Sequence, residues 1–285
     1  MKLQHVTVRV DAEKPFRALH LSDNHLCLAD ERDNERKQAL AERRGRAFAG
    51  DHPDRLLERL TEQLDYAVSE GLFLIYSGDV IDFVSEKNLE TAGALLSRAD
   101  TFMAAGNHEY SQYVGEAWED EVYKAQSFDA VMDAMPGNVW FQTRIIHGVK
   151  FIALDNNYYY VTEALFDRFR EAVSDGMPVV LVVHNPLYSP DTYEKVMAGK
   201  PADTPPYLFG CPEELLRGLD DHRYRQQKPD DLTVDFVRFC ANTPNLKAVL
   251  AGHLHQFCAA ELTSGIPQII AGAGYAGDAV EYCFI

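Results

Sequence analysis

Five short groups of polar residues stand out, because their side chains have the chemistry of metal ligands. Carboxylate oxygens and neutral imidazole nitrogens are the usual protein ligands of zinc, manganese and iron. Glycines in three of the groups permit backbone turns that a Cβ atom would block. The groups are Asp23-x-His25, Gly78-Asp79-x-x-Asp82, Gly106-Asn107-His108-Glu109, His184 and Gly252-His253-x-His255.

The number of candidate ligands indicates two metal ions. Seven side chains are too many for one tetrahedral ion, but they suit two ions that share one carboxylate. Two ions about 3.5–4 Å apart can hold the attacking and the leaving oxygen of a phosphoryl displacement. The candidate ligands are Asp23, His25, Asp79, Asn107, His184, His253 and His255.

The charge of such a site would differ from that of the whole chain. The 285 residues include 27 Lys and Arg against 44 Asp and Glu, which gives a formal net charge of −17. A field of that sign repels nucleic acids and anionic lipids. Two divalent ions beside Asp23 and Asp79 would leave the site at about +2. We therefore expect a small-molecule phosphate ester as the substrate, and we do not expect a nucleic acid.

Each polar group follows a short apolar run, and this placement indicates an α/β fold. Several runs are continuously apolar, as is typical of strands that are covered on both faces. An amphipathic helical pattern lies at 56–68 and ends at Gly71. Because strands and helices alternate, we expect an α/β sheet that carries the site at its strand ends. The predicted strands are 17–21, 72–76, 101–104, 139–146, 149–154, 178–183, 246–250 and 268–271.

Two segments interrupt this alternation within what we expect to be a single domain over residues 1–285. Residues 30–47 are dense in charges of both signs, which predicts a solvated helix or arm. Its cluster Arg43-Arg44-x-Arg46 could steer phosphate, but we expect a solvated face. Residues 189–231 are rich in Pro, Gly and charge and are too long for a plain connection, which predicts a lid or cap.

In their order along the chain, the five groups resemble the motifs of the calcineurin-like metallophosphoesterase superfamily. The motifs D-x-H, G-D-x-x-D, G-N-H-E, H and G-H-x-H span Asp23 to His255. Each motif alone is common, but the five in this order are a specific signal. The resemblance implies a four-layer α/β/β/α sandwich, in which two mixed sheets are flanked by helices.

The resemblance also implies how the ligands divide between two ions. Manganese, iron and zinc all suit this ligand set. Asp79 would bridge the ions, and a hydroxide between them would attack phosphorus. The first ion would be held by Asp23, His25 and His255, and the second by Asn107, His184 and His253.

Two further residues would assist the chemistry. The resemblance implies that His108 donates a proton to the leaving oxygen or stabilises its charge. Asp82 would orient His108 through a hydrogen bond, which would fix the tautomer of the ring. The alternative for Asp82 is the N-cap of a following helix.

Departures from the family patterns narrow the expected substrate. Phe83-Val84 stands where protein serine/threonine phosphatases carry Arg-Gly, and Asp82 stands where purple acid phosphatases place a metal-binding tyrosine. The remaining resemblance is to bacterial phosphodiesterases and nonspecific phosphoesterases, so we expect hydrolysis of phosphodiesters of nucleotide or phospholipid type. The alternatives are a phosphomonoesterase, a pyrophosphatase or a nuclease on the same site and, more remotely, a non-catalytic scaffold.

The remaining features have plainer interpretations. Five scattered cysteines without a C-x-x-C motif indicate reduced thiols and a cytoplasmic protein. No apolar run reaches the roughly 18–20 residues of a membrane helix, and the N-terminus lacks a secretory pattern. We expect His20 in the core, Cys27 as an inert buried thiol, Glu109 in a structural hydrogen bond, and the tyrosines at 158–160 in packing rather than in stacking on a base or lipid.

Overall fold

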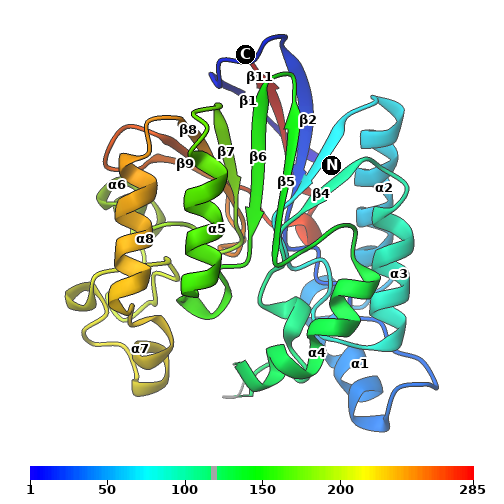
Figure 1. Cartoon of the computed structure of the whole chain (residues 1–285). Helices are drawn as coiled ribbons and strands as arrows, with labels where there is room; N and C mark the ends of the chain where they lie inside the picture. The colour runs from blue at the N-terminus through cyan, green and yellow to red at the C-terminus, as the bar shows by residue number, and fades with distance from the viewer. Residues whose placement is uncertain (117–120) are drawn as a thin grey trace.

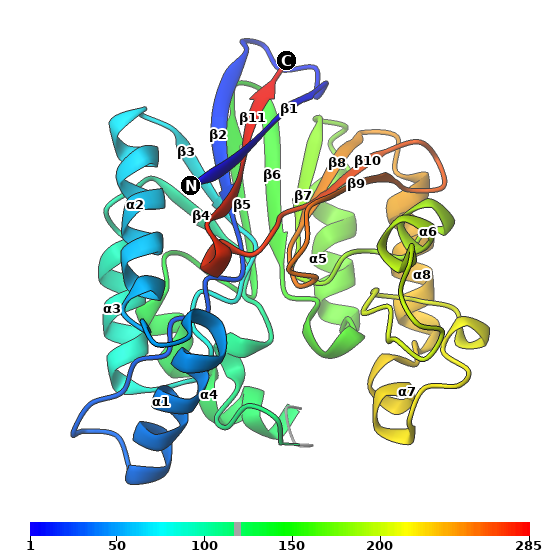
Figure 2. The same cartoon turned by 180° about the vertical axis from the view of Figure 1, so that it is seen from behind.

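The computed structural model describes residues 1–116 and 121–285, and their helices and strands form four layers (Figure 1, Figure 2). Two sheets pack face to face in the middle. Helices α1–α4, within residues 35–134, lie on the outer side of one sheet, and α5, α6 and α8, within residues 163–242, lie on the outer side of the other. The predicted fold class, with two mixed sheets flanked by helices, is confirmed.

The first sheet joins both ends of the chain. Its order is β1-β11-β2-β3-β4, and every neighbouring pair is parallel except β11 and β2. Strand β11 lies between β1 and β2, so the C-terminal strand completes the sheet that the N-terminal strand begins. The strands are β1 (Lys2–Val8), β2 (Phe16–Leu21), β3 (Phe73–Tyr76), β4 (Thr101–Met103) and β11 (Asp278–Phe284).

The second sheet is parallel in its centre and antiparallel at its two edges. Its order is β5-β6-β7-β8-β10-β9, with antiparallel pairs β5–β6 and β10–β9. The strands are β5 (Phe141–Ile146), β6 (Val149–Leu154), β7 (Val179–Val182), β8 (Leu246–Ala251), β9 (Cys258–Glu261) and β10 (Pro267–Ile270).

Both faces of the central strands are buried, because each sheet has the other sheet on one side and helices on the other. In β3, Phe73 and Ile75 point toward the second sheet, whereas Leu74 and Tyr76 point toward the helices. The rings of Phe73 and Phe151 meet between the sheets with centroids 5.4 Å apart. Burial on both faces explains why these strands read as continuous apolar runs.

Several helices begin at a polar side-chain cap and bury one face. The predicted helix at 56–68 is α2, in which Leu56, Leu60 and Leu64 are buried and after which Gly71 adopts φ +61°. The side chain of Ser85 caps α3 by accepting the Asn88 N–H. The helices are α1 (Glu35–Ala49), α2 (Arg55–Ser69), α3 (Glu86–Leu96), α4 (Glu121–Ala134), α5 (Glu163–Val173), α6 (Pro190–Met197), α7 (Asp221–Gln227) and α8 (Asp231–Asn242).

All eight predicted strands are present, but the prediction missed β1, β9 and β11. Strands β1 and β9 are sheet edges with several exposed side chains, so neither contains a continuous apolar run. In β11, Glu281 interrupts the run and pairs with Arg17 of β2 (2.8 Å). No helix in the described ranges is both long and apolar enough to cross a membrane.

Candidate active site

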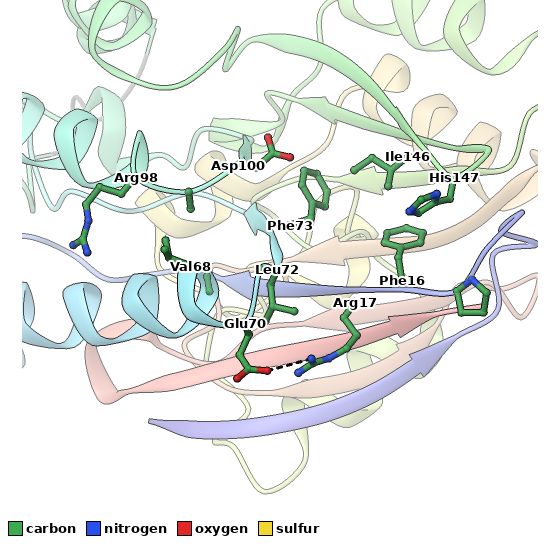
Figure 3. A pocket seen from close by; sticks show the side chains of 14 residues that line it. Phe16, Arg17, Val68, Glu70, Leu72, Phe73, Arg98, Asp100, Ile146 and His147 are labelled. Atoms are coloured by element: carbon green, nitrogen blue, oxygen red, sulfur yellow. Dashed lines mark hydrogen bonds and ion pairs between the residues drawn. The ribbon is translucent and has the colours of Figure 1, made fainter.

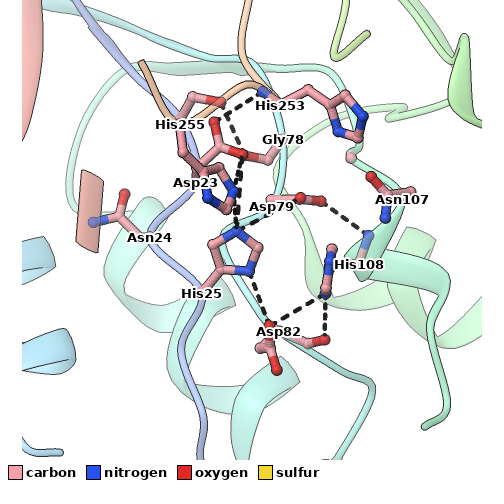
Figure 4. A network of polar contacts seen from close by, with 12 residues as sticks. Asp23, Asn24, His25, Gly78, Asp79, Asp82, Asn107, His108, His253 and His255 are labelled. Carbon is pink, nitrogen blue, oxygen red and sulfur yellow. Dashed lines mark hydrogen bonds and ion pairs between the residues drawn. The ribbon is translucent and has the colours of Figure 1, made fainter. Parts of the chain in front are cut away.

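The five polar groups meet where β2, β3, β4, β7 and β8 end, and Figure 4 shows four of them. Within each sheet these strands run parallel, so their carboxyl ends share one edge. Because the two sheets pack face to face, the two edges face a common space. All seven predicted ligands, together with His108 and Asp82, lie at this place.

The first cluster contains Asp23, His25 and His255. The Nε2 atoms of His25 and His255 are 3.0 Å apart. Asp23 Oδ1 lies 3.3 Å from His255 Nε2 and 3.8 Å from His25 Nε2. Three potential ligand atoms thus face one another.

The second cluster contains Asp79, His184 and His253, with Asn107 beside them. His184 Nε2 lies 3.1 Å from His253 Nδ1, 3.2 Å from Asn107 Oδ1 and 3.2 Å from Asp79 Oδ2. The same Asp79 oxygen is 3.8 Å from His25 Nε2. Asp79 therefore lies between the two clusters, at the position of a shared ligand.

The spacing of these atoms fits metal ions. Atoms bound about 2.1 Å from one ion, at angles of about 90–109°, are about 3.0–3.4 Å apart, and the shorter separations in both clusters fall in or near this range. Asp23 Oδ1 is buried and has no hydrogen-bond donor of acceptable geometry among the described residues. Because an uncompensated buried carboxylate oxygen is costly, the atom fits a bound cation.

Each of the four histidines is held through the ring nitrogen that points away from its cluster. This arrangement is typical of metal-binding histidines, because the outer contact fixes both tautomer and orientation. The outer contacts are His25 Nδ1 to Asp82 Oδ1 (3.0 Å), His184 Nδ1 to the Ser77 carbonyl (2.7 Å), His253 Nε2 to the Tyr159 hydroxyl (2.6 Å) and His255 Nδ1 to the Tyr275 hydroxyl (3.5 Å).

Three of these partners were not found from the sequence. Tyr159 was expected only in packing, and neither Ser77 nor Tyr275 was singled out. Tyr159 is buried, but its hydroxyl reaches a histidine 94 positions away in the chain. No periodicity or motif in the sequence reports such a contact.

The carboxylates and His253 have the protonation states of metal ligands. Burial raises the pKa of Asp79, but the neighbouring His184 and His108 outweigh it and hold the pKa below the usual range. For Asp23, His25 and His255 likewise outweigh burial. Burial and then the nearby His184 lower the pKa of His253 to about 3, so its imidazole is neutral at pH 7. Ionised carboxylates and neutral imidazoles are the ligand forms of these groups. Burial lowers the pKa of His184, but Asp79 outweighs burial and raises it to about 9, so a metal ion would displace a proton from this imidazole.

The backbone is strained at the same positions. Five of the seven candidate ligands have left-handed φ angles, between 49° and 70°. Such angles cost non-glycine residues about 1–3 kcal/mol each and cluster at functional sites. Gly106 shows how tight the loops are, since a Cβ atom there would clash with the Asp79 carboxylate. The strained residues are Asp23, His25, Asp79, His253 and His255.

Glu109 fixes the loop that carries Asp79. Its buried carboxylate accepts the backbone N–H groups of Asp79 (2.7 Å), Val80 (2.7 Å) and Gly106 (2.6 Å). The expected structural hydrogen bond is thus confirmed. The expectations of a buried His20 and a buried Cys27 are also confirmed.

Asp82 connects His25, His108 and the segment at 30–47. Its carbonyl accepts His108 Nδ1–H (2.7 Å), and its Oδ1 lies 3.3 Å from the same nitrogen. Arg44 donates to both carboxylate oxygens, from Nε to Oδ2 (2.6 Å) and from Nη2 to Oδ1 (2.8 Å). The alternative of Asp82 as a helix N-cap is wrong, because Ser85 caps α3.

The expectation that the whole arginine cluster is a solvated face is wrong for Arg44. Helix α1 packs with Leu40 buried, and this docking directs Arg44 toward Asp82 and over the ring of Phe48 (4.8 Å to the centroid). Arg46 does remain exposed, where it pairs with Glu42 (2.7 Å). The difference arises because the two arginines lie on different faces of one helix.

A cavity of about 480 Å³ adjoins the clusters. Its walls include Arg44, His108, Tyr158 and His253. The segment predicted as a lid contributes Lys200, Thr204, Pro205, Tyr207, Arg223 and Gln226.

A larger hollow of about 730 Å³ lies at the opposite ends of β2, β3 and β4 (Figure 3). Its charged side chains form ion pairs: Arg17 with Glu70, Arg98 with Asp65 and Asp100 with Arg144. None of the potential metal-binding groups found in the described part of the chain lies there. The chemistry is therefore concentrated in the cavity beside Asp79.

Comparison with known proteins identifies the class. The family model for calcineurin-like phosphoesterases matches residues 16–257, and the chain belongs to that family. It is therefore a metal-dependent hydrolase of phosphoric esters, and the family and the two side-chain clusters together support a dinuclear metal site. No curated protein matches the chain.

Several solved structures share the fold at low identity. A dimetal phosphatase from Danio rerio is 13% identical, with a TM-score of 0.51, over 91% of this chain and 88% of that one. A putative 5′-nucleotidase from Staphylococcus aureus is 12% identical (TM-score 0.45) over 92% of this chain and 49% of that one. GAP50 of Plasmodium, described as an anchor in the inner membrane complex, is 10% identical (TM-score 0.45) over 91% of this chain and 72% of that one. At these identities the likeness is one of fold.

Proposed function

We propose that this protein hydrolyses phosphodiesters of nucleotide or phospholipid type at the site around Asp79. The observation that carries the proposal is that Asp79 lies between two clusters of ligand atoms. Its Oδ2 is 3.2 Å from His184 Nε2 in one cluster and 3.8 Å from His25 Nε2 in the other. Asp23, His25 and His255 would hold one ion, and Asn107, His184 and His253 the other. When bound, the ions, for which we propose manganese, iron or zinc, would supply Lewis acidity toward phosphate and a nucleophilic water at neutral pH.

The residues of the chain have three tasks in this proposal. Asp82 holds Nδ1 of His108 through its carbonyl, and His108 lines the cavity. A proton on His108 Nε2 would pass to the leaving oxygen. Arg44 balances the charge of Asp82, which also fixes His25.

The diester preference rests on the charge near His108. Phe83 and Val84 are buried in the apolar core, so this part of the chain brings no cation to the extra negative charge of a monoester. The second candidate is monoester hydrolysis, and the observation that favours it is the presence of Arg44, Lys200 and Arg223 in the cavity wall. The wall contributed by residues 189–231 supports their proposed role as a lid over a small-molecule site. The cytoplasmic location expected from the cysteines stays a prediction.

The test is hydrolysis by protein of known metal content. The protein is stripped with a chelator, reloaded with Mn²⁺, Fe²⁺ or Zn²⁺, and assayed with bis-p-nitrophenyl phosphate and p-nitrophenyl phosphate. We expect about two bound ions per chain and faster hydrolysis of the diester. Faster hydrolysis of the monoester would select the second candidate, and no hydrolysis of either ester with any of the ions would contradict the proposal.

A further inference from the structure

The cavity beside Asp79 has a charge opposite to that of the protein. In a chain of net charge −17, the described cavity wall contains three cationic side chains, Arg44, Lys200 and Arg223, and a single carboxylate, Asp79. Asp79 is buried between the two ligand clusters, and Arg44 is paired with Asp82. Among the described residues of the wall, no carboxylate therefore pairs with Lys200 or Arg223.

Arg223 is held in a defined orientation. Its Nη1 donates to Gln226 Oε1 (2.7 Å) on the same helix, α7. Its Cζ lies 5.7 Å from the centroid of the Tyr207 ring. Among the described residues it has no ion pair with a carboxylate, so its remaining donors are available to a ligand in the cavity.

Tyr207 determines the distance of Arg223 from the ligand clusters. One side of the Tyr207 ring meets the His253 ring at 5.7 Å and 82°, and Arg223 packs against the same tyrosine. The Tyr207 backbone, with φ +53°, is fixed by its N–H bond to the buried Gln227 Oε1 (2.8 Å). The distance from Arg223 Cζ to the centroid of the His253 ring therefore cannot exceed the sum of these two 5.7 Å separations.

Lys200 contributes a second positive charge from the other end of the same segment. It follows α6 and lines the cavity together with Thr204 and Tyr207. Lys200 is exposed as a residue, and the desolvation of its ammonium group against the cavity wall lowers its pKa from the usual value. An anion at this place would compensate the lost solvation.

We propose that Arg223 and Lys200 form a second anion-binding subsite, so that the preferred substrate is a small phosphate ester with a further phosphate or carboxylate group beyond the scissile phosphate. The inference rests on the proposed function, because it assumes that the scissile phosphate lies at the ligand clusters. A planar guanidinium can bind either anion through two parallel hydrogen bonds. The cavity volume of about 480 Å³ is that of a small-molecule site.

The subsite can be tested by competition. Hydrolysis of bis-p-nitrophenyl phosphate by the Mn²⁺-loaded protein is inhibited with two matched pairs: adenosine 5′-monophosphate against adenosine 3′,5′-bisphosphate, and glycerol 3-phosphate against 3-phosphoglycerate. We expect the member with two anionic groups to bind at least about tenfold more tightly, as is usual for a hydrogen-bonded charged group. A preference in the first pair alone identifies phosphate as the second anion, and a preference in the second pair shows that carboxylate is also accepted.

Variants test whether Arg223 and Lys200 cause the preference for the inhibitor with two anionic groups. Arg223→Ala and Lys200→Ala should each reduce the ratio of the two affinities severalfold, and the double variant should bring this ratio close to one. Arg225→Ala is the matched control, because Arg225 lies on the same helix but is largely exposed and pairs with Asp221 (3.7 Å). Lys200 lies in an exposed loop, so Lys200→Ala remains informative if Arg223→Ala does not fold.

Two results would overturn the subsite: no preference in the wild-type protein, or an unchanged preference in the double variant. Either result leaves the hydrolysis of bis-p-nitrophenyl phosphate, and hence the proposed function, intact. If the wild-type protein hydrolyses no phosphate ester with any metal, the proposed function fails, and the inference fails with it.

Discussion

Arg44 and Asp82 form a two-pronged ion pair at the edge of the ligand clusters, with N–O distances of 2.6 and 2.8 Å. The Asp82 carboxylate is fully buried, and burial alone would raise its pKa. Hydrogen bonds from Arg44, His108 and His25 outweigh burial and hold the pKa well below its usual range. The ion pair therefore connects helix α1 to two histidines of the site.

Loss of this ion pair should affect both stability and catalysis. Arg44→Ala leaves a buried carboxylate without its cationic partner, so we expect the free energy of unfolding to fall by about 2 kcal/mol. We also expect kcat to fall, since His25 and His108 share the carboxylate. Urea unfolding and hydrolysis of bis-p-nitrophenyl phosphate measure the two effects. Arg46→Ala, an exposed change on the same helix, should have neither effect. If Arg44→Ala and Arg46→Ala had the same stability and the same kcat, the assigned contact between Arg44 and Asp82 would be contradicted.

Tyr159 should control how tightly the site binds metal. Tyr159→Phe keeps the buried ring but removes the hydroxyl that lies 2.6 Å from His253 Nε2. Loss of such an outer contact typically costs about 10–100-fold in metal affinity or activity. A Mn²⁺ titration of the stripped protein measures the affinity. Tyr193→Phe serves as the control, because Tyr193 packs against Tyr188 and is neither in the ligand clusters nor in the described wall of the cavity. Equal affinities in the two variants would show that Tyr159 only packs.

Substitution of His108 should lower the catalytic rate without loss of metal, whereas substitution of Asp79 should abolish both metal binding and activity. His108→Ala should retain about two ions but lose about 10²–10⁴-fold in kcat, because it removes only the proton donor. Asp79→Ala should lose metal and activity together, because it removes the shared ligand. Elemental analysis and single-substrate kinetics on the same preparations make the comparison. A His108→Ala variant with unchanged kcat would remove the role proposed for His108.

Glu281 should make stability depend on pH. Burial raises the pKa of Glu281, but hydrogen bonds from Tyr66 (2.7 Å) and Arg17 (2.8 Å) outweigh it, and the pKa is lowered on folding. A lowered pKa stabilises the folded state above the unfolded-state value, about 4.3, and this contribution is lost as the pH falls through the folded-state value.

Glu281→Gln should therefore be less stable than the wild-type protein at pH 7, by about 1 kcal/mol. The difference should shrink as the pH approaches 3. Urea unfolding of both proteins at pH 7, 5 and 3 gives the comparison. A difference that is constant over this range would show that ionisation of Glu281 contributes nothing.

The positions of the ligands could be predicted from the sequence because each follows a strand. Asp23, Asp79, His184 and His253 come within a few residues after apolar runs that became β2, β3, β7 and β8. Parallel strands bring their carboxyl ends to one edge. Local sequence therefore contained enough information to place chemically suitable side chains together.

The supporting contacts could not be predicted in this way. Arg44 reaches Asp82 across 38 positions, and Tyr159 reaches His253 across 94. Both contacts depend on how a helix or a loop docks on the sheet edge, and the spacing of apolar residues does not record that docking. Similarly, the edge strands β1 and β9 lacked a continuous apolar run because several side chains of each are exposed.

The most direct test of the dinuclear site is a crystal structure of the protein grown with Mn²⁺, examined by anomalous scattering at the manganese edge. We expect two peaks about 3.5–4 Å apart, one on each side of the Asp79 carboxylate, with His25 and His255 beside one peak and His184 and His253 beside the other. A single peak, or peaks away from Asp79 in protein that hydrolyses the diester, would contradict the dinuclear site.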